Sequence, residues 1–491
     1  HRSAPSRGAT RQAPHLLALP SEILVEILRY LRLADVPAVS ATCRHLNSLL
    51  HGPGASQGLW RSLHGNGLAN DEARKVLPVL QPVFPCDCNV CSAAFPGSAY
   101  RDELRAGAAW HRGRPLESTL CNFKPARHQR GGHQRPAVLA MPCLQLHGSQ
   151  LVYSQENRLY RLRLNAGDCW QRLVATDAYR GSVGAADVTA LSVESPADGG
   201  RALVGTGDGR LLLWASDGAG PPRRLHGHPF DQSAMNCIDS CSAAAAGFDC
   251  WRLVLAGTKG GSLMAARLNG DCCVQDTQQN RGSWRSWNSG DRIYACRLAP
   301  DGSGVALIGC AGLTNASSTT AGTDAAEGGG PLRLVNIETG AQLAAGQPLT
   351  DTGLRRRGSG IRGVAFQSVS LAVTVGYDAR VRLWDLRMLG GGVATQRHRL
   401  PAAVWEDPSD CAGTAVQADR CHTVLVGLMQ HGLVRLYDIR QTRTHVRTFY
   451  KGAHYPDCVA RLTRSPVYSL DFNAHCFVRG LDSEINCVRF A

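Results

Sequence analysis

With 491 residues, of which 44% are hydrophobic, the chain can bury a large core and form more than one domain. No apolar run is long enough to span a bilayer and no signal-peptide pattern opens the sequence, so we expect no membrane association and a cytoplasmic or nuclear location. The net charge of +14 is not gathered into a dense basic stripe with interleaved aromatic residues, which argues against nucleic-acid binding.

The cysteine pattern argues against a domain stabilised by disulfides, and the composition of the first residues argues against an ordered N-terminal segment. The 19 cysteines are odd in number and scattered through a chain too large to need covalent staples, which favours free thiols. Residues 1–15 are basic and lack apolar periodicity, so we predict a disordered basic tail.

The segment LPSEILVEILRYL, residues 19–31, has the pattern of a short amphipathic helix. Pro20 is tolerated in a first helical turn, and the Ser21 hydroxyl can accept a hydrogen bond from an unpaired amide there. Apolar residues recur at helical spacing on one face, which therefore needs a partner. These residues are Ile23, Leu24, Ile27, Leu28 and Leu31.

A second helix is predicted after Asp35, because Pro37 falls in its first turn and Gly52 follows its last apolar residue. Its apolar stripe consists of Val36, Val39, Cys43, Leu46 and Leu50. We expect the two helices to form an αα-hairpin domain over residues 16–65. A helical or irregular linker over residues 66–114 follows it.

The linker contains CDCNVC, in which Cys86, Cys88 and Cys91 include one pair at zinc-ligand spacing. A zinc site needs four ligands, so Cys121 or His111 would have to complete it. Ordinary free thiols are the simpler interpretation. We therefore predict no metal and no other cofactor.

A repeat with a period near fifty residues occupies the rest of the chain. VTVGYDARVRLWDLR, residues 373–387, is copied in VLVGLMQHGLVRLYDIR, residues 424–440. Aligned copies share one anchor position, occupied by Leu164, Trp214, Leu268, Val335, Trp384, Tyr437 and Phe490. Five of the six spacings between anchors lie between 49 and 54 residues. The sixth, 67 residues, contains the small-residue run 312–330, which reads as a loop insertion.

Each repeat supplies three short strands up to its anchor and a fourth strand after it. Four-stranded antiparallel sheets repeated about an axis form a β-propeller, so seven anchors predict a mainly β, seven-bladed propeller over residues 115–491. Because the chain ends on a third strand, STLCNF at 118–123 is expected to complete the last sheet and close the ring.

The dipeptides Gly227-His228 and Trp384-Asp385 are typical of the WD repeat, although other copies are degenerate. A kelch-type propeller has a similar period. Its paired glycines do not recur here at fixed offsets, so we predict the WD type.

The helical segment, taken together with Trp60, resembles an F-box. The match rests on Leu19, Pro20, Glu22, Ile23, Leu24, Ile27, Leu31, Asp35, Val39, Cys43 and Arg44, with departures at Pro37, Ser40, His45 and Asn47. An F-box followed by a WD-type propeller is similar to the F-box/WD-repeat proteins. AWHRGR at 109–114, the stretch 141–162 and the terminal SPVYSLDF narrow the likeness to the dactylin subgroup.

The resemblance implies that the F-box docks onto the adaptor subunit of an SCF-type cullin–RING ubiquitin ligase, and through it onto the cullin and RING subunits. An exposed apolar helix face suits such docking. The residues expected to contact the adaptor are Leu19, Pro20, Ile23, Leu24, Ile27, Leu28, Leu31, Val39 and Cys43. The alternative is that the same stripe packs against the chain's own residues 59–110.

In a propeller, the loops entering each first strand and the turns between second and third strands share one face. On this face the sequence places Arg210, Arg292, Arg355, Arg356, Arg362 and Arg380. The resemblance implies that the face binds an acidic or phosphorylated protein substrate, for which arginine has bidentate geometry. In an arginine-rich chain, the alternative for each residue is an ordinary solvated surface.

No sequence motif of a catalytic site stands in the structural context that its chemistry needs. GSGIRG at 358–363 matches a dinucleotide fingerprint, but it precedes a strand rather than a helix. Nothing assembles a nucleophile, a base and an oxyanion site. We therefore predict a non-catalytic substrate-recognition subunit. The alternatives are a propeller scaffold with no ligase role and a metal-dependent enzyme at Cys86, Cys88 and Cys91.

Overall fold

A computed structural model describes residues 19–28, 39, 45–46, 49, 115–122 and, with gaps, 141–490. The gaps are 148–149, 165–169, 178–185, 194–200, 215–222, 226–232, 244–250, 270–283, 313–329, 347–359, 390–399, 420–421, 442, 451–464, 474–475 and 483. The chain divides into two compact units, residues 1–112 and 113–491. In the described part, no helix is long and apolar enough to cross a membrane.

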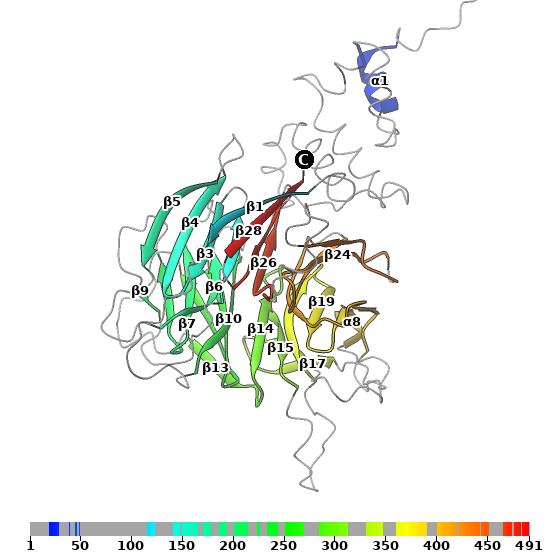
Figure 1. The fold of residues 1–491 in the computed structure, drawn as a ribbon. Helices are drawn as coiled ribbons and strands as arrows, with labels where there is room; N and C mark the ends of the chain where they lie inside the picture. The colour runs from blue at the N-terminus through cyan, green and yellow to red at the C-terminus, as the bar shows by residue number, and fades with distance from the viewer. Residues whose placement is uncertain are drawn as a thin grey trace, which may run out of the picture. The chain divides into compact units, whose positions relative to one another are not determined.

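The second unit consists of seven four-stranded antiparallel sheets, here called blades 1 to 7 (Figure 1). Blade 1 contains β2 (Leu144–His147), β3 (Gln150–Gln155), β4 (Arg158–Leu164) and β5 (Trp170–Asp177). Blade 2 contains β6 (Val188–Val193), β7 (Ala202–Thr206), β8 (Leu211–Trp214) and β9 (Arg223–Arg224). Blade 3 contains β10 (Met235–Ala243), β11 (Trp251–Thr258), β12 (Ser262–Asn269) and β13 (Trp284–Asn288).

Blades 4 to 6 repeat this order, and blade 7 uses one strand from far upstream. Blade 4 contains β14 (Ile293–Leu298), β15 (Val305–Cys310), β16 (Leu332–Asn336) and β17 (Gln342–Gly346). Blade 5 contains β18 (Ile361–Phe366), β19 (Leu371–Gly376), β20 (Arg380–Asp385) and β21 (Ala403–Glu406), with the short helix α8 (Leu386–Leu389) after β20. Blade 6 contains β22 (Gly413–Ala418), β23 (Thr423–Leu428), β24 (Val434–Asp438) and β25 (Arg447–Phe449). Blade 7 contains β26 (Ser469–Phe472), β27 (Cys476–Gly480), β28 (Glu484–Phe490) and β1 (Pro115–Asn122).

The first strands of neighbouring blades contact one another all the way round, from β2 through β6, β10, β14, β18, β22 and β26 back to β2. These strands therefore form the inner wall of a closed ring. Each anchor of the repeat lies in the third strand of its blade. The prediction of a seven-bladed β-propeller is confirmed. Gly227-His228 and residues 313–329 of the expected insertion lie outside the described residues.

Polar side chains of the inner strands join one blade to the next. An Asp239 carboxylate oxygen accepts a hydrogen bond from the Leu298 amide at 2.7 Å, so blade 3 holds blade 4. Asp471 accepts one from the Leu146 amide at the same distance, so blade 7 holds blade 1. Hydrogen bonds that accept with a carboxylate are among the stronger ones in proteins, and these tie sheets that share no backbone ladder.

The recurring glycine near the end of the second strand is required by close blade packing. A Cβ atom on Gly257 would lie 2.6 Å from Cγ2 of Ile293, and one on Gly309 would lie 2.8 Å from Cγ2 of Ile361. Real Cβ atoms do not approach carbon so closely. The glycine therefore lets the inner strand of the next blade approach the sheet.

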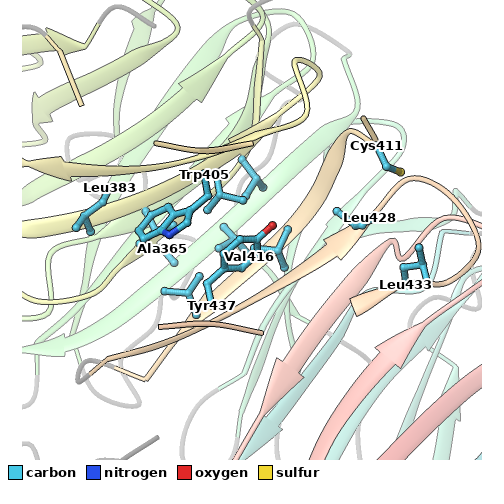
Figure 2. Close-up of a cluster of buried hydrophobic side chains, with 13 residues drawn as sticks. Ala365, Leu383, Trp405, Cys411, Val416, Leu428, Leu433 and Tyr437 are labelled. Atoms are coloured by element: carbon cyan, nitrogen blue, oxygen red, sulfur yellow. The ribbon is translucent and has the colours of Figure 1, made fainter. Parts of the chain in front are cut away.

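Apolar side chains fill the space between adjacent blades, as Figure 2 shows for blades 5 and 6. Trp405 and Tyr437, both 1% exposed, meet edge to face with ring centroids 5.8 Å apart. The Trp405 indole N–H donates to the Gln441 carbonyl at 2.7 Å, so its one polar atom is satisfied. Each blade thus buries both faces, which explains the nearly continuous apolar runs of the second strands.

The WD-type signature survives in blades 5 and 6. The indole N–H of Trp384 donates to the Thr374 hydroxyl at 2.8 Å inside blade 5. Asp385 pairs with Arg387 at 2.7 Å, and the equivalent Asp438 of blade 6 pairs with Arg440 at 2.5 Å. The repeated sequences WDLR and YDIR therefore make the same local ion pair, and their role is structural.

The strand predicted at 118–123 is present as β1 and pairs antiparallel with β28 (Figure 1). Arg479 of β27 is fully buried, and its guanidinium reaches Glu117 of β1 at 2.5 Å and the Gly432 carbonyl of blade 6 at 2.7 Å. Asn486 donates to the same Glu117 oxygen at 2.9 Å. Burial lowers the pKa of Arg479, and Glu117 opposes that shift. The last strand of the ring is thus clamped by a buried ion pair.

Replacing Glu117 by alanine should lower the free energy of unfolding of the propeller by about 3–5 kcal/mol, because it leaves the Arg479 charge buried without its carboxylate. Urea unfolding followed by tryptophan fluorescence measures the change. The control is Glu406→Gln, which removes the exposed partner of the Arg380 pair and should cost no more than about 1 kcal/mol. Equal losses in the two variants would contradict the role assigned to Glu117.

A second prediction concerns His445, whose ring is hydrogen-bonded to the Thr448 hydroxyl at 2.9 Å and lies 3.3 Å from a guanidinium nitrogen of Arg435. Burial and then the Arg435 charge lower the pKa of His445, while Asp407 raises it by a smaller amount. Between the ordinary pKa of 6.5 and the lower folded value, the unfolded chain binds more protons than the folded one.

The contribution of His445 should therefore be complete above pH 6.5 and decline as the pH falls toward its folded pKa. Unfolding measured from about pH 7.5 to pH 5 should show a weaker pH dependence in His445→Gln than in the wild type. His45→Gln, in the other unit, is the control. An unchanged slope in His445→Gln would disprove the prediction.

Candidate protein-interaction surfaces

The first unit contains α1 (Ser21–Leu28), which begins where the amides of Ile23 and Leu24 donate to the Pro20 carbonyl at 3.0 and 3.1 Å. Leu24 is 1% exposed and Leu28 is 3% exposed, whereas Ile23 is 49% and Ile27 is 42% exposed. Each pair is four residues apart and occupies one stripe of the helix. The apolar face therefore has two halves, of which only one is uncovered.

This division changes the set of residues available to a partner. Leu24 and Leu28, which the sequence placed at the adaptor contact, are buried in the folded chain. Ile23 and Ile27 are open, Pro20 is exposed, and Leu19 and Val39 are half-buried. Leu31 and Cys43 lie outside the described residues, as do Cys86, Cys88 and Cys91.

The arginines predicted on the propeller face fall into three groups. Arg210 pairs with Asp208 of its own hairpin at 2.9 Å, and Arg380 pairs with Glu406 of its own blade at 2.8 Å. Arg355 and Arg356 lie outside the described residues. Arg292 and Arg362 form the third group, because no carboxylate among the described residues makes an ion pair with either.

Arg362 lies against two tyrosine rings. Its guanidinium carbon is 5.4 Å from the ring centroid of Tyr294 and 5.4 Å from that of Tyr377. It also donates to the Tyr377 hydroxyl at 2.8 Å. The two rings meet edge to face with centroids 6.0 Å apart. Cation–π contacts of this kind hold a guanidinium in place without neutralising its charge.

Tyr468 and Arg292 complete this group. The Tyr468 hydroxyl donates to Asp482 at 2.5 Å; burial and then this carboxylate raise the pKa of Tyr468, while Arg362 acts in the opposite direction. Burial raises the pKa of Tyr294 as well, and both Arg362 and Arg292 oppose that shift. We call Arg292, Tyr294, Arg362, Tyr377 and Tyr468 the rim cluster.

The inner strands position the rim cluster by a repeated irregularity. In blades 2 to 6 the pairing of the first strand with the second skips one residue near its start. The skipped residues, here called bulge positions, are Thr189, Asn236, Tyr294, Arg362 and Thr414. Bulges commonly redirect a side chain, and all five lie at the same end of the ring wall.

Sequence reasoning found Arg292 and Arg362 but missed the three tyrosines of the rim cluster. A signal was available for two of them. In the first-strand runs VTALSV, MNCIDS, IYACRL, IRGVAF and VYSLDF, the second letters are Thr, Asn, Tyr, Arg and Tyr. Aligning the repeats at this position would have grouped Tyr294, Arg362 and Tyr468. Tyr377 belongs to the hairpin after β19 and has no such signal.

Comparison with known proteins agrees with this architecture. The model of the F-box-like family matches residues 16–65. The human protein named F-box/WD repeat-containing protein 4 is 22% identical over 479 residues, covering 94% of this chain and 92% of that protein. This chain is therefore similar to the F-box/WD-repeat proteins.

A Mus musculus protein of the same name is 30% identical over 175 residues, which span 35% of this chain and 37% of the mouse relative. Both names are consistent with the dactylin subgroup. Among solved structures, the RRP9 WD40 repeats are 13% identical with a TM-score of 0.49, covering 77% of this chain and 100% of that one. The WD40 propeller domain of Doa1 is 12% identical with a TM-score of 0.47, covering 76% and 97%.

The two halves of α1 should respond differently to truncation. Leu24→Ala should destabilise the F-box unit by about 2–5 kcal/mol, because it removes a buried side chain. Ile23→Ala, at an exposed position of the same helix, should change stability by no more than about 0.5 kcal/mol. Hydrogen exchange of the α1 amides in the full chain measures both effects. Equal protection in the two variants would contradict the division of the face.

Proposed function

We propose that this chain is the substrate-recognition subunit of an SCF-type cullin–RING ubiquitin ligase, with the F-box binding the adaptor and the propeller binding a protein substrate. The observation that carries the proposal is the exposure of Ile23 and Ile27 on α1, inside the segment that the F-box-like family model matches. Two isoleucines at i and i+4 form a compact apolar stripe, which suits insertion into a groove of another protein.

The buried half of α1 supports the same proposal. Leu24 and Leu28 are buried, so one stripe of α1 is packed while the other stays exposed. A helix that is already folded loses less conformational entropy on binding than a helix that must first fold. Docking of Ile23 and Ile27 would remove large apolar side chains from water, at about 1.5–3 kcal/mol for each.

In this proposal the propeller supplies the substrate surface and no chemistry. The substrate is a protein, and the cullin and RING subunits are reached through the adaptor. Arg292 and Arg362 are the arginines best suited to contact it, since Arg210 and Arg380 are paired with carboxylates of their own blades. The ligase acts in the cytoplasm or the nucleus.

The double variant Ile23→Glu with Ile27→Glu tests the adaptor interaction in the full chain. It should weaken co-purification with the purified adaptor roughly a hundredfold or more, because both apolar contacts are lost and two charges must be desolvated. Hydrogen exchange of α1 verifies that the helix persists in the variant.

The matched control is Val369→Glu, which changes an apolar side chain of similar exposure, 54%, in the turn between β18 and β19 of the propeller. It should bind the adaptor as the wild type does. If the wild type fails to bind, or if the double variant binds equally well, the ligase assignment is wrong and an interaction scaffold without a ligase role takes its place.

A further inference from the structure

Large apolar side chains that stay in water gather at one end of the seam between blades 4 and 5. Six large apolar side chains are exposed in the described part of the propeller, and four of them lie at this end. The other two are Met141 and Tyr450. We call the four the seam patch: Leu343, Val369, Met388 and Leu400, which are 46%, 54%, 48% and 37% exposed.

Antiparallel pairing places the seam patch at a single end of the two blades. The β18–β19 turn, the connection from β20 to β21 and the turn that leads into β17 lie at this end, opposite the end that carries the rim cluster. The Leu386 amide donates to the Ser370 carbonyl at 2.8 Å, so α8 begins beside the turn that carries Val369. α8 also contacts β17, the strand of Leu343. The patch therefore spans the seam.

Met388 and Leu400 border the end of β20. Met388 lies on the solvent side of α8, because the two leucines of this helix are buried. The Ala402 amide donates to the Leu383 carbonyl at 2.8 Å, which holds the chain just after Leu400 against the end of β20. Both side chains are thus presented by backbone that is tied to blade 5.

The fold does not require these side chains to be apolar. The Ser368 hydroxyl accepts hydrogen bonds from two amides of the β18–β19 turn, at 3.3 and 3.0 Å, so a serine and not Val369 supports this turn. α8 is fixed by its buried leucines and by Asp385, whose carboxylate accepts the Arg387 amide at 3.1 Å. A polar side chain in place of Met388 would leave these contacts intact.

The equivalent turns of blade 4 are polar. Asp301 and Ser303 are exposed in its β14–β15 turn, and Glu338 and Thr339 are exposed in its β16–β17 turn. Polar residues are favoured in such turns because they bond to nearby amides and remain hydrated. Blade 5 departs from this pattern by exposing apolar side chains on a turn and a helix that are both held in place.

The size of the seam patch indicates the kind of partner. Four side chains that are about half exposed offer an apolar area on the order of 200–300 Å². Stable interfaces between globular proteins bury about 800 Å² on each partner, so pairing with a second copy of this chain would need much more surface. Two or three large side chains of one short segment would cover the patch.

We infer that the seam patch is a docking site for a short segment of another protein, which places two large aliphatic or aromatic side chains over Val369 and Met388. This role goes beyond the proposed function, because it uses the end of the ring opposite the rim cluster and no part of α1. The contact is apolar rather than ionic: Arg387, the exposed cation next to Met388, is paired with Asp385 at 2.7 Å.

The test uses the full chain and three pools of twelve-residue peptides whose other positions are degenerate and polar. One pool has leucine at positions 5 and 9, as on one side of a helix, and a second has leucine at positions 5 and 7, as on one side of a strand. The third has serine at all three positions. In fluorescence anisotropy, one leucine pool should bind about tenfold more tightly than the serine pool, and Met388→Glu and Val369→Glu should each abolish that preference.

Met141→Glu is the matched control. Met141 is 53% exposed, close to the 48% of Met388, but it precedes β2 at the other end of the ring, so this variant should bind every pool as the wild type does. Methyl NMR of isotope-labelled methionine locates the contact, since the preferred pool should shift the Met388 signal and leave the Met141 signal unchanged. Thermal unfolding verifies that both glutamate variants of the patch remain folded.

Equal binding of the three pools by the wild type would overturn the inference, as would a leucine preference that persists in both Met388→Glu and Val369→Glu. Sedimentation equilibrium tests the other occupant. Self-association of the wild type that is lost in Met388→Glu would assign the patch to a second copy and overturn the peptide partner. Adaptor co-purification of the same preparations reports on the proposed function separately, and every variant of the patch should bind the adaptor normally.

Discussion

Closure of the ring is the constraint on which the rest of the propeller depends. Six blades are built from consecutive strands, but the seventh is completed by β1, which precedes the first blade in the chain. The Arg479 charge is buried between β27, Glu117 of β1 and the blade 6 hairpin, so three parts of the sequence must meet for it to be tolerated. Closing a ring in this way gives every inner strand two neighbours. Side chains at the bulge positions of these inner strands then either bond to the neighbouring strands or lie at one end of the ring.

Within that closed wall, the equivalent bulge positions carry side chains with different partners. Asn236 and Thr414 satisfy the backbone of the next blade and stabilise the ring. Arg362 gives up such a bond and is supported by aromatic rings instead. Cation–π contacts support this arginine but leave its charge without an acid beside it among the described residues. This departure from the repeat is therefore the best physical reason to connect the rim cluster with binding.

The F-box unit follows a similar logic on a smaller scale. A helix of eight residues is too short to be stable in water by itself, so part of its apolar face must be buried within the folded chain. Leu24 and Leu28 meet that need. Ile23 and Ile27 remain in water, an unfavourable arrangement that a partner can relieve. The sequence pattern shows one apolar face, and the structure shows that stability and recognition divide it.

Much of the fold could be predicted from the residues alone. The anchor spacing predicted seven blades and the apolar run near residue 118 predicted a further strand, because alternation and period are local properties of a sequence. The candidate site was predictable only in part. Arg210, Arg292, Arg362 and Arg380 look alike in the sequence, and only the folded chain decides that two of them are paired with Asp208 and Glu406 while Arg362 lies between Tyr294 and Tyr377. Whether a charge is neutralised depends on which groups the fold brings beside it, on the same blade for Arg210 and Arg380 and on two blades for Arg362, and that is a property of tertiary structure.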